Sequence, residues 1–303
     1  MANPVQATRP LIVGEVLFDQ FPNGQRVLGG APFNVAWNLH GFGMAPIFGS
    51  AVGKDEEGRE VQTQMEAWGL DTTALQISEK WPTGKVRVEL NGGEPRFHIL
   101  DQQAYDQIRY PTLDSSLADC LLLYVGSLAT RNEPSKSTIR RLIRESGLPR
   151  FVDINIRQPW FDRESAAELL ENAVWIKLND QELSWIAETP CRTAGDIRIA
   201  VETLRRLYGG QQYFITCGAA GAYAIDEVGD SLFAEAPKPE TMVDAVGAGD
   251  AFVAAAIFGI SRDRPVDEIL QTAVRFASQV CTIQGATSPD RNHYTRLGDR
   301  TWG

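Results

Sequence analysis

The sequence predicts an α/β fold with one mainly parallel sheet, and three observations lead to this prediction. Four short apolar runs, CLLLYVGSL, RFVDINIR, AVWIKLND and QQYFITCG, end in polar or glycine residues, as buried strands do. Segments with helical spacing of apolar residues lie among them, at 133–147 and 194–209. Strands that alternate with helices form βαβ units, whose strands run parallel and are covered on both faces. The chain has 303 residues, which is enough for one such domain with a sizeable core.

The first hundred residues contain three predicted elements. RPLIVGEVLFDQF, residues 9–21, predicts a first strand, and APFNVAWNLHGFG, residues 31–43, predicts a helix that ends in glycine. TGKVRVELNGGEPRFHIL, residues 83–100, alternates apolar and polar residues around NGG, which is typical of a β-hairpin. A hairpin of this kind inside an α/β chain is expected to be a flap outside the central sheet, although a surface hairpin without a function would look the same. Because neither a repeat nor a linker-like stretch interrupts the pattern, we expect one domain over residues 1–303.

Charge and composition exclude several classes of protein. The net charge of −10 argues against a nucleic-acid or acidic-membrane partner, since both need a basic surface. No run reaches the roughly 18 apolar residues of a membrane span, and the start lacks the pattern of a secretory signal, so we expect a cytoplasmic protein. The four cysteines and three histidines are scattered, without the spacing of a zinc site.

The stretch DAVGAGDAF, residues 244–252, precedes a long apolar run and carries the clearest chemical signal. Gly247, Ala248 and Gly249 would expose backbone N–H groups at the start of a buried helix, where an anion is favoured. Asp250 in the first turn would repel a phosphate as a ligand, but it suits a base that accepts the proton of an attacking hydroxyl during phosphoryl transfer. A helix-capping aspartate is the other interpretation of the same residues. The chain lacks the GxxxxGK[ST] pattern of a P-loop and an N-terminal GxGxxG, which disfavours an NAD-dependent enzyme.

With this stretch the chain resembles the PfkB/ribokinase family of carbohydrate kinases over nearly its whole length. Successive motifs of that family resemble, in chain order, GEVLFDQFP with LGGAPFNVAWNLHGFG, FGSAVGKDEEG, KLNDQE, ITCGAAGA and DAVGAGD. The stretches GEVLFD, GGAPFNVAWNL and VDINIR are most similar to the bacterial fructokinase branch. The resemblance implies a ribokinase-like three-layer α/β/α sandwich with a mainly parallel central sheet. It also implies a small β-sheet lid, built from about 16–30 and 82–108. Because an apolar hairpin face needs a cover, we expect a homodimer through this lid, with Val86 and Val88 at the interface.

The resemblance also implies roles for residues that, taken alone, fit turns and helix caps. It places the reaction at Asp250 as base and at the anion-binding turn Gly247, Ala248 and Gly249. The sugar would contact Asp19, Gly29, Gly30 and Asn34. The nucleotide would contact Thr216, Gly218, Gly221 and Lys177, with the helix in 274–286 on its adenine side. Asn179 and Glu182 would organise Mg²⁺ and its water, although an N-cap with an acidic first turn explains them equally well.

The expected activity is ATP- and Mg²⁺-dependent phosphorylation of a small sugar, with D-fructose at its 6-hydroxyl as the first choice. Gly126 and Ser127 stand where ribokinases carry a sugar-contacting glutamate, which disfavours ribose. Ala245 replaces the usual threonine of the signature, so a monovalent-cation site lined by carbonyl groups of 285–290 stays open. Two alternatives also remain: a kinase for another sugar, 2-keto-3-deoxygluconate or a nucleoside, and a non-catalytic sensor of nucleotide or sugar on the same fold.

Overall fold

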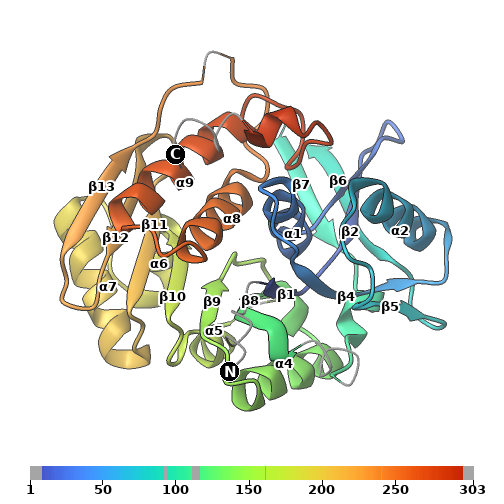
Figure 1. Cartoon of the computed structure of the whole chain (residues 1–303), viewed down its shortest axis with the longest axis horizontal. Coiled ribbons are helices and arrows are strands. Elements are labelled where there is room, and N and C mark those ends of the chain that lie inside the picture. Colours follow the sequence, from blue (N-terminus) through green and yellow to red (C-terminus); the bar gives the residue numbers. More distant parts are fainter. Residues whose placement is uncertain (1–8, 92–93, 111–116, 161, 240, 296–303) are drawn as a thin grey trace, which may run out of the picture.

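A mostly parallel sheet of nine strands forms the middle layer of the molecule (Figure 1). The computed structural model describes residues 9–91, 94–110, 117–160, 162–239 and 241–295. In spatial order the strands are β5 (Leu75–Ser78), β4 (Ile47–Gly53), β1 (Arg9–Val13), β8 (Cys120–Gly126), β9 (Arg150–Asp153), β10 (Trp175–Asn179), β11 (Gln212–Thr216), β12 (Gly221–Ile225) and β13 (Ser231–Glu235). From β5 to β11 every pair is parallel, while β12 and β13 add an antiparallel edge. The predicted strands after residue 110 are therefore confirmed.

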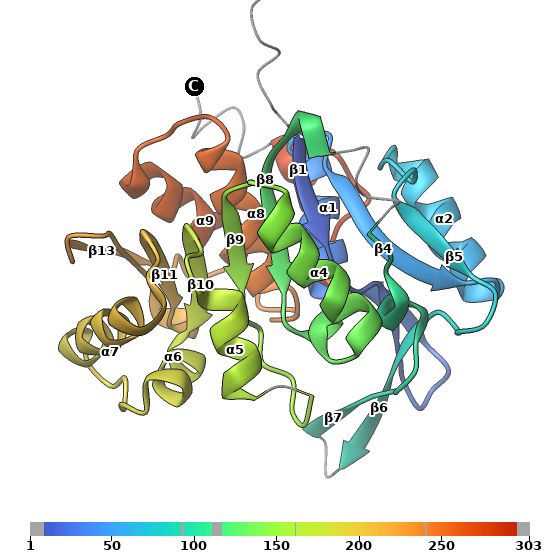
Figure 2. The same cartoon turned by 90° about the horizontal axis from the view of Figure 1, so that it is seen from below.

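Helices cover both faces of this sheet and complete the predicted three layers (Figures 1 and 2). One face packs against α1 (Ala31–Gly41), α2 (Glu56–Trp68), α8 (Ala248–Ile260) and α9 (Val266–Val280). The other packs against α4 (Glu133–Glu145), α5 (Arg163–Leu170), α6 (Asp180–Ala187) and α7 (Ala194–Tyr208). The alternation of β1 divides the two cores, since Ile12 belongs to the first, and Leu11 and Val13 to the second. Within the described residues, no helix is both long and apolar enough to cross a bilayer.

A second sheet of four strands lies beside the central one. Its order is β3 (Arg26–Gly29), β2 (Leu17–Gln20), β6 (Gly84–Asn91) and β7 (Glu94–Ile99), and β6 and β7 form the predicted hairpin. The Gly92–Gly93 turn of that hairpin lies outside the described residues. In Figure 2 the hairpin extends away from the central sheet, on the side of α4.

Two predictions about the N-terminal region are wrong. Residues 9–21 form two strands in different sheets, because the chain turns at Gly14, where a Cβ atom would lie 2.3 Å from the ring of Pro32. Val86 and Val88, which were expected at a subunit interface, are instead buried within the chain itself. Val86 and Val88 are only 4% and 1% exposed, and Val86 packs with Leu17 of the neighbouring strand.

Two further elements are shorter than the sequence indicated. The strand predicted within 150–157 ends at Asp153, and residues 154–157 leave the sheet as a loop. The helix predicted within 274–286 ends at Val280, with turns and bends after it. Both segments that follow contribute residues to the candidate site described below.

Candidate active site

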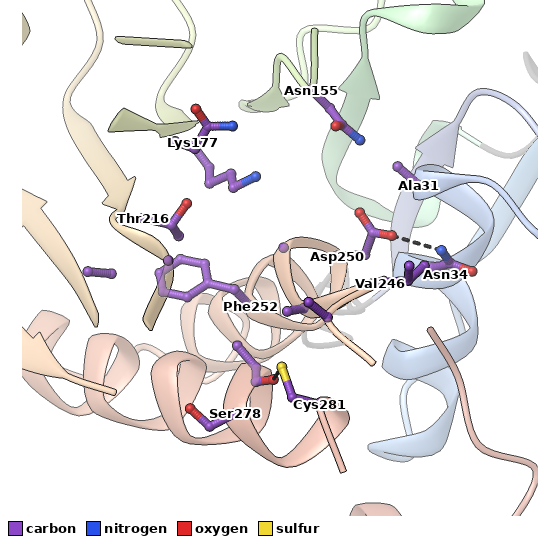
Figure 3. A pocket seen from close by; sticks show the side chains of 18 of the residues that line it. Ala31, Asn34, Asn155, Lys177, Thr216, Val246, Asp250, Phe252, Ser278 and Cys281 are labelled. Atoms are coloured by element: carbon purple, nitrogen blue, oxygen red, sulfur yellow. Dashed lines mark hydrogen bonds between the residues drawn. The ribbon is translucent and has the colours of Figure 1, made fainter. Parts of the chain in front are cut away.

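A cavity of about 680 Å³ lies beyond the carboxyl ends of the parallel strands, between the small sheet and the antiparallel edge of the large one. Ligands of open α/β sheets bind at such ends. Every site residue predicted from the sequence lines this cavity except Gly29 and Glu182. The N-terminus of α8 lies in the middle of the cavity wall, as Figure 3 shows for Asp250 and its neighbours.

Asp250 lies in the first turn of α8, where the sequence predicted it, and is 9% exposed. Its Oδ2 accepts a hydrogen bond of 2.8 Å from Nδ2 of Asn34 on α1 (Figure 3). Burial raises the pKa of Asp250, while the bond from Asn34 and the charges of Lys177 and Arg157 oppose that rise. The carboxylate is thus a buried acceptor of fixed orientation, supported by cations.

The glycine turn before Asp250 has a conformation that only glycine adopts readily. Gly247 has a φ of 79°, and a Cβ atom there would lie 2.2 Å from the Cβ of Ala286. The amide of Ala248 donates to the carbonyl oxygen of Ala245 at 3.3 Å, while the next amides of the first turn lack carbonyl partners within the helix and are available to the cavity. A Cβ atom on Gly249 would lie 3.2 Å from Nζ of Lys177, which places the ammonium group beside these amides. An arrangement of this kind, with a cation at its side, could hold an anion.

Lys177 points from β10 toward the same turn (Figure 3). Its Nζ lies 3.0 Å from Oδ1 of Asp153 at the end of β9, and both side chains are buried. Burial would lower the pKa of Lys177, but the carboxylates of Asp153, Glu182 and Asp250 reverse this effect and raise it. The lysine therefore remains cationic inside the cavity wall.

The opposite side of the cavity holds the predicted sugar residues. Asp19 is on β2 of the small sheet, not on the first strand of the large sheet as the sequence suggested. A Cβ atom on Gly29 would lie 3.9 Å from Oδ2 of Asp19 and 3.8 Å from Oδ1 of Asn34, so these polar groups converge. At Gly30, with a φ of 111°, a Cβ atom would lie 2.7 Å from the carbonyl oxygen of Glu15. Burial raises the pKa of Asp19 to about 6, and Arg157 opposes the shift.

The predicted nucleotide residues line the other end of the cavity. Thr216 ends β11, and Gly218 and Gly221 follow it with positive φ angles of 55° and 128°. A Cβ atom on Gly221 would lie 2.0 Å from the carbonyl oxygen of Ala234, so this close approach requires glycine. Lys238 adds a cation to the same end, and α9 contributes Val274, Ala277 and Ser278.

Asn179 and Glu182 form a capping box at the start of α6. The Asn179 side chain accepts from the Glu182 amide at 2.7 Å, and Oε2 of Glu182 accepts from the Asn179 amide at 2.8 Å. Oε1 of Glu182 accepts from the amide of Ile156 at 2.9 Å. Both carboxylate oxygens of Glu182 are therefore engaged by backbone. Among the residues that the structure describes, no group of three or more His, Cys, Asp or Glu side chains could hold a metal ion.

The sequence interpretation missed several lining residues, among them Glu15, Asn155, Arg157 and Lys238. Glu15 follows β1 and is 5% exposed, and its Oε2 has no hydrogen-bond partner. Burial raises its pKa to about 7, against the opposing charge of Arg157. Asn155 and Arg157 follow β9, with Asn155 at a φ of 46°. Their position directly after parallel strands was the signal that could have found them.

The chain has a ribokinase-like fold. A fructokinase of Xylella fastidiosa with bound ATP superposes with a TM-score of 0.81 at 21% identity, over 98% of this chain and all of that one. An Arabidopsis thaliana ribokinase complexed with ribose and ATP has the same TM-score at 20% identity, over 97% and 99% of the chains. A fructokinase of Klebsiella pneumoniae is 29% identical in sequence, over 91% of this chain and 92% of its own length.

The family is settled by a match of residues 7–292 to the model of the pfkB family of carbohydrate kinases. The chain belongs to this family and is a phosphotransferase that acts on a sugar.

Proposed function

We propose that this sugar kinase transfers the γ-phosphoryl group of ATP to the 6-hydroxyl of D-fructose. The observation that carries the proposal is the position of Asp250, a buried carboxylate at the N-terminus of α8. It lies in one cavity between the polar side chains around Asp19 and the glycine-rich loop after β11. Phosphoryl transfer needs an acceptor hydroxyl beside a base and an anion-binding site for the transferred group. This cavity combines both within one helical turn.

In the proposed reaction Asp250 accepts the proton of the attacking hydroxyl. Asn34 engages Oδ2, which leaves Oδ1 to take that proton. The hydroxyl oxygen forms a bond to the γ-phosphorus, the bond from phosphorus to the bridging oxygen of ATP breaks, and ADP leaves with the electron pair. The first amides of α8, Lys177 and Arg157 would stabilise the charge on the transferred group, because they are oriented before the reaction begins.

The sugar hydroxyls would be held by acceptors on the opposite wall. Asp19 and Asn34 supply oxygen atoms close to the bare backbone of Gly29 and Gly30. Glu15 adds a buried carboxyl oxygen without a protein partner, which suits a ligand hydroxyl because an unpaired buried acceptor is unfavourable. The hairpin contributes Phe97 and Ile99 as apolar cover and would exclude water from the reacting groups.

ATP would occupy the end formed by Thr216, Gly218, Gly221 and Lys238, with its adenine toward α9. Two supports are the ATP in the Xylella fastidiosa fructokinase structure and the ADP in that of a Vibrio cholerae fructokinase. Mg²⁺ would neutralise charge on the phosphates. Because the capping bonds occupy Asn179 and Glu182, these residues would act on the ion through water, which matches the slow dehydration of Mg²⁺.

The acceptor is tested by a coupled assay of ADP release over a panel of D-fructose, D-ribose, 2-keto-3-deoxygluconate and aminoimidazole riboside. The last is included because a kinase for it in Salmonella typhimurium is 25% identical over 91% of this chain. We expect the highest kcat/KM with D-fructose, and a product phosphorylated at the 6-position. A higher kcat/KM for any other member would replace fructose as the substrate. ATP binding without turnover of any member would favour the sensor.

A further inference from the structure

Arg131 lies outside the cavity and is the centre of a buried cluster at the base of the hairpin. Its side chain is 0% exposed and forms a two-pronged ion pair with Asp106: Nε to Oδ1 and Nη2 to Oδ2, both at 2.8 Å. Nη2 also donates to the carbonyl oxygen of Leu100 at 2.7 Å. Leu100 directly follows β7, so the arginine binds the point at which the hairpin returns to the body of the protein.

The guanidinium group is also in contact with two aromatic rings. Its central carbon lies 4.9 Å from the ring centroid of Tyr105 and 4.7 Å from that of Trp160. Arginine over an aromatic face is a favourable and directional contact. Tyr105 packs with Leu17 and Val86 of the small sheet, and Trp160 packs against the same cluster. One side chain therefore joins the base of the hairpin to the segment that ends at Trp160.

That segment carries two of the residues that line the sugar side of the cavity, Asn155 and Arg157. Two hydrogen bonds tie its first half to the body of the protein: the amide of Ile156 donates to Oε1 of Glu182 at 2.9 Å, and Oγ of Ser127 donates to the carbonyl oxygen of Asn155 at 3.3 Å. Within the segment, the amide of Trp160 donates to the carbonyl oxygen of Arg157 at 2.9 Å. Trp160 is in turn fixed by Arg131. The far end of the segment is thus held by the arginine that also fixes the hairpin.

We propose that Arg131 is a positioning residue: it holds the hairpin and residues 154–160 (the Arg157 segment) in fixed positions relative to each other, on the sugar side of the cavity. It does not line the cavity. Arg157 influences Glu15, Asp19 and Asp250 electrostatically, so a shift of its segment would change the field at all three carboxyl groups. A shift of the hairpin would move Phe97 and Ile99 off the acceptor. The inference rests on the proposed function, in particular on the assignment of this side of the cavity to the sugar.

The test uses steady-state kinetics of the whole chain with the best acceptor of the panel. Arg131→Lys keeps the charge but loses the planar fork, and Trp160→Leu removes the second ring while leaving the ion pair intact. Arg140→Lys is the matched control, because Arg140 pairs with Glu168 on the outer side of α4 and touches neither segment. We expect both test variants to raise the KM of the acceptor about tenfold, with the KM of ATP within about twofold of wild type, as misplacement of binding groups does. Arg140→Lys should leave both constants unchanged.

A purely structural role would lower the melting temperature and the fraction of active enzyme without changing the acceptor KM. Acceptor KM values for Arg131→Lys and Trp160→Leu within about twofold of the Arg140→Lys value would therefore overturn the proposal. If Arg131→Lys does not fold, Trp160→Leu alone decides, since Trp160 is only partly buried. A selective rise in the KM of ATP would instead contradict the assignment of this side to the sugar, and with it the proposed function.

Discussion

Replacement of Asp250 by asparagine separates its catalytic role from a capping role. Asparagine has the same shape, and its side-chain oxygen can still accept from Nδ2 of Asn34, so the 2.8 Å contact can persist. The base is lost, however, because an amide does not take up the proton of the hydroxyl. We expect kcat to fall about 10²-fold or more, a loss of about 2.7 kcal/mol in transition-state stabilisation, with both KM values nearly unchanged.

The stability of the Asp250→Asn variant should not fall together with its kcat, and this distinguishes a catalytic role from a capping role. Burial raises the pKa of Asp250 in the folded state, so the folded protein binds this proton more tightly than the unfolded chain does. The contribution of Asp250 to stability therefore falls as pH rises from the ordinary carboxyl range through the raised pKa. The amide of the Asp250→Asn variant does not titrate, so its melting temperature should equal or exceed that of wild type at neutral pH. Turnover within about threefold of wild type, or a large fall in melting temperature, would refute the assignment of Asp250 as the base and leave it a structural cap.

Four further predictions concern single features. Asp19→Ala should raise the KM of the sugar far more than the KM of ATP, since Asp19 lies on the wall opposite the proposed nucleotide end. Equal effects on both KM values would show that Asp19 does not belong to the sugar site. Gly247→Ala should lower kcat and should reduce the free energy of unfolding by about 1–3 kcal/mol, seen as a lower melting temperature, because the new Cβ atom would meet Ala286 at 2.2 Å. A variant with wild-type kinetics would show that the turn tolerates a shift. Burial raises the pKa of Glu15 from 4.5 to about 7, so the melting temperature of the wild-type protein should fall as pH rises through that interval. Glu15→Gln should reduce this dependence of melting temperature on pH. An unchanged dependence would assign it to other groups. The predicted homodimer should sediment as a dimer at micromolar concentration, whereas a fully active monomer would exclude it.

The central sheet was predictable because its strands are continuous apolar runs. Such runs arise when both faces of a parallel strand are buried, as they are at β8, β10 and β11 between the two cores. The small sheet was harder to predict, because β1 and β2 read as one apolar run, whereas in the structure the chain bends between them at Gly14, which packs close to Pro32. No local pattern reports a contact between residues so far apart in the chain.

The candidate site also contains some residues that the sequence predicted and others that it could not predict. Asp250 and the turn before it could be predicted because their local geometry, a positive φ followed by a helix start, is specified within four residues. The importance of Glu15 and Arg157 could not be predicted from local geometry, since it comes from burial and from the charge that each presents to the other across the cavity. A carboxylate in a strand-end sequence is ordinary; a carboxylate with an unpaired buried oxygen in the wall of a ligand cavity is not.

For Glu182 the sequence pattern predicted only part of what the side chain contacts. Its spacing from Asn179 predicted either an organiser of Mg²⁺ or a helix cap, and the structure contains the complete capping box. The same carboxylate also accepts from the amide of Ile156, in the loop that follows β9 and next to Arg157. A glutamate that caps α6 and holds the loop after β9 would couple the proposed phosphate side of the cavity to the proposed sugar side. Glu182→Gln keeps the acceptor oxygen at one position only, so its loss of activity would report this coupling even where no metal ligand is removed.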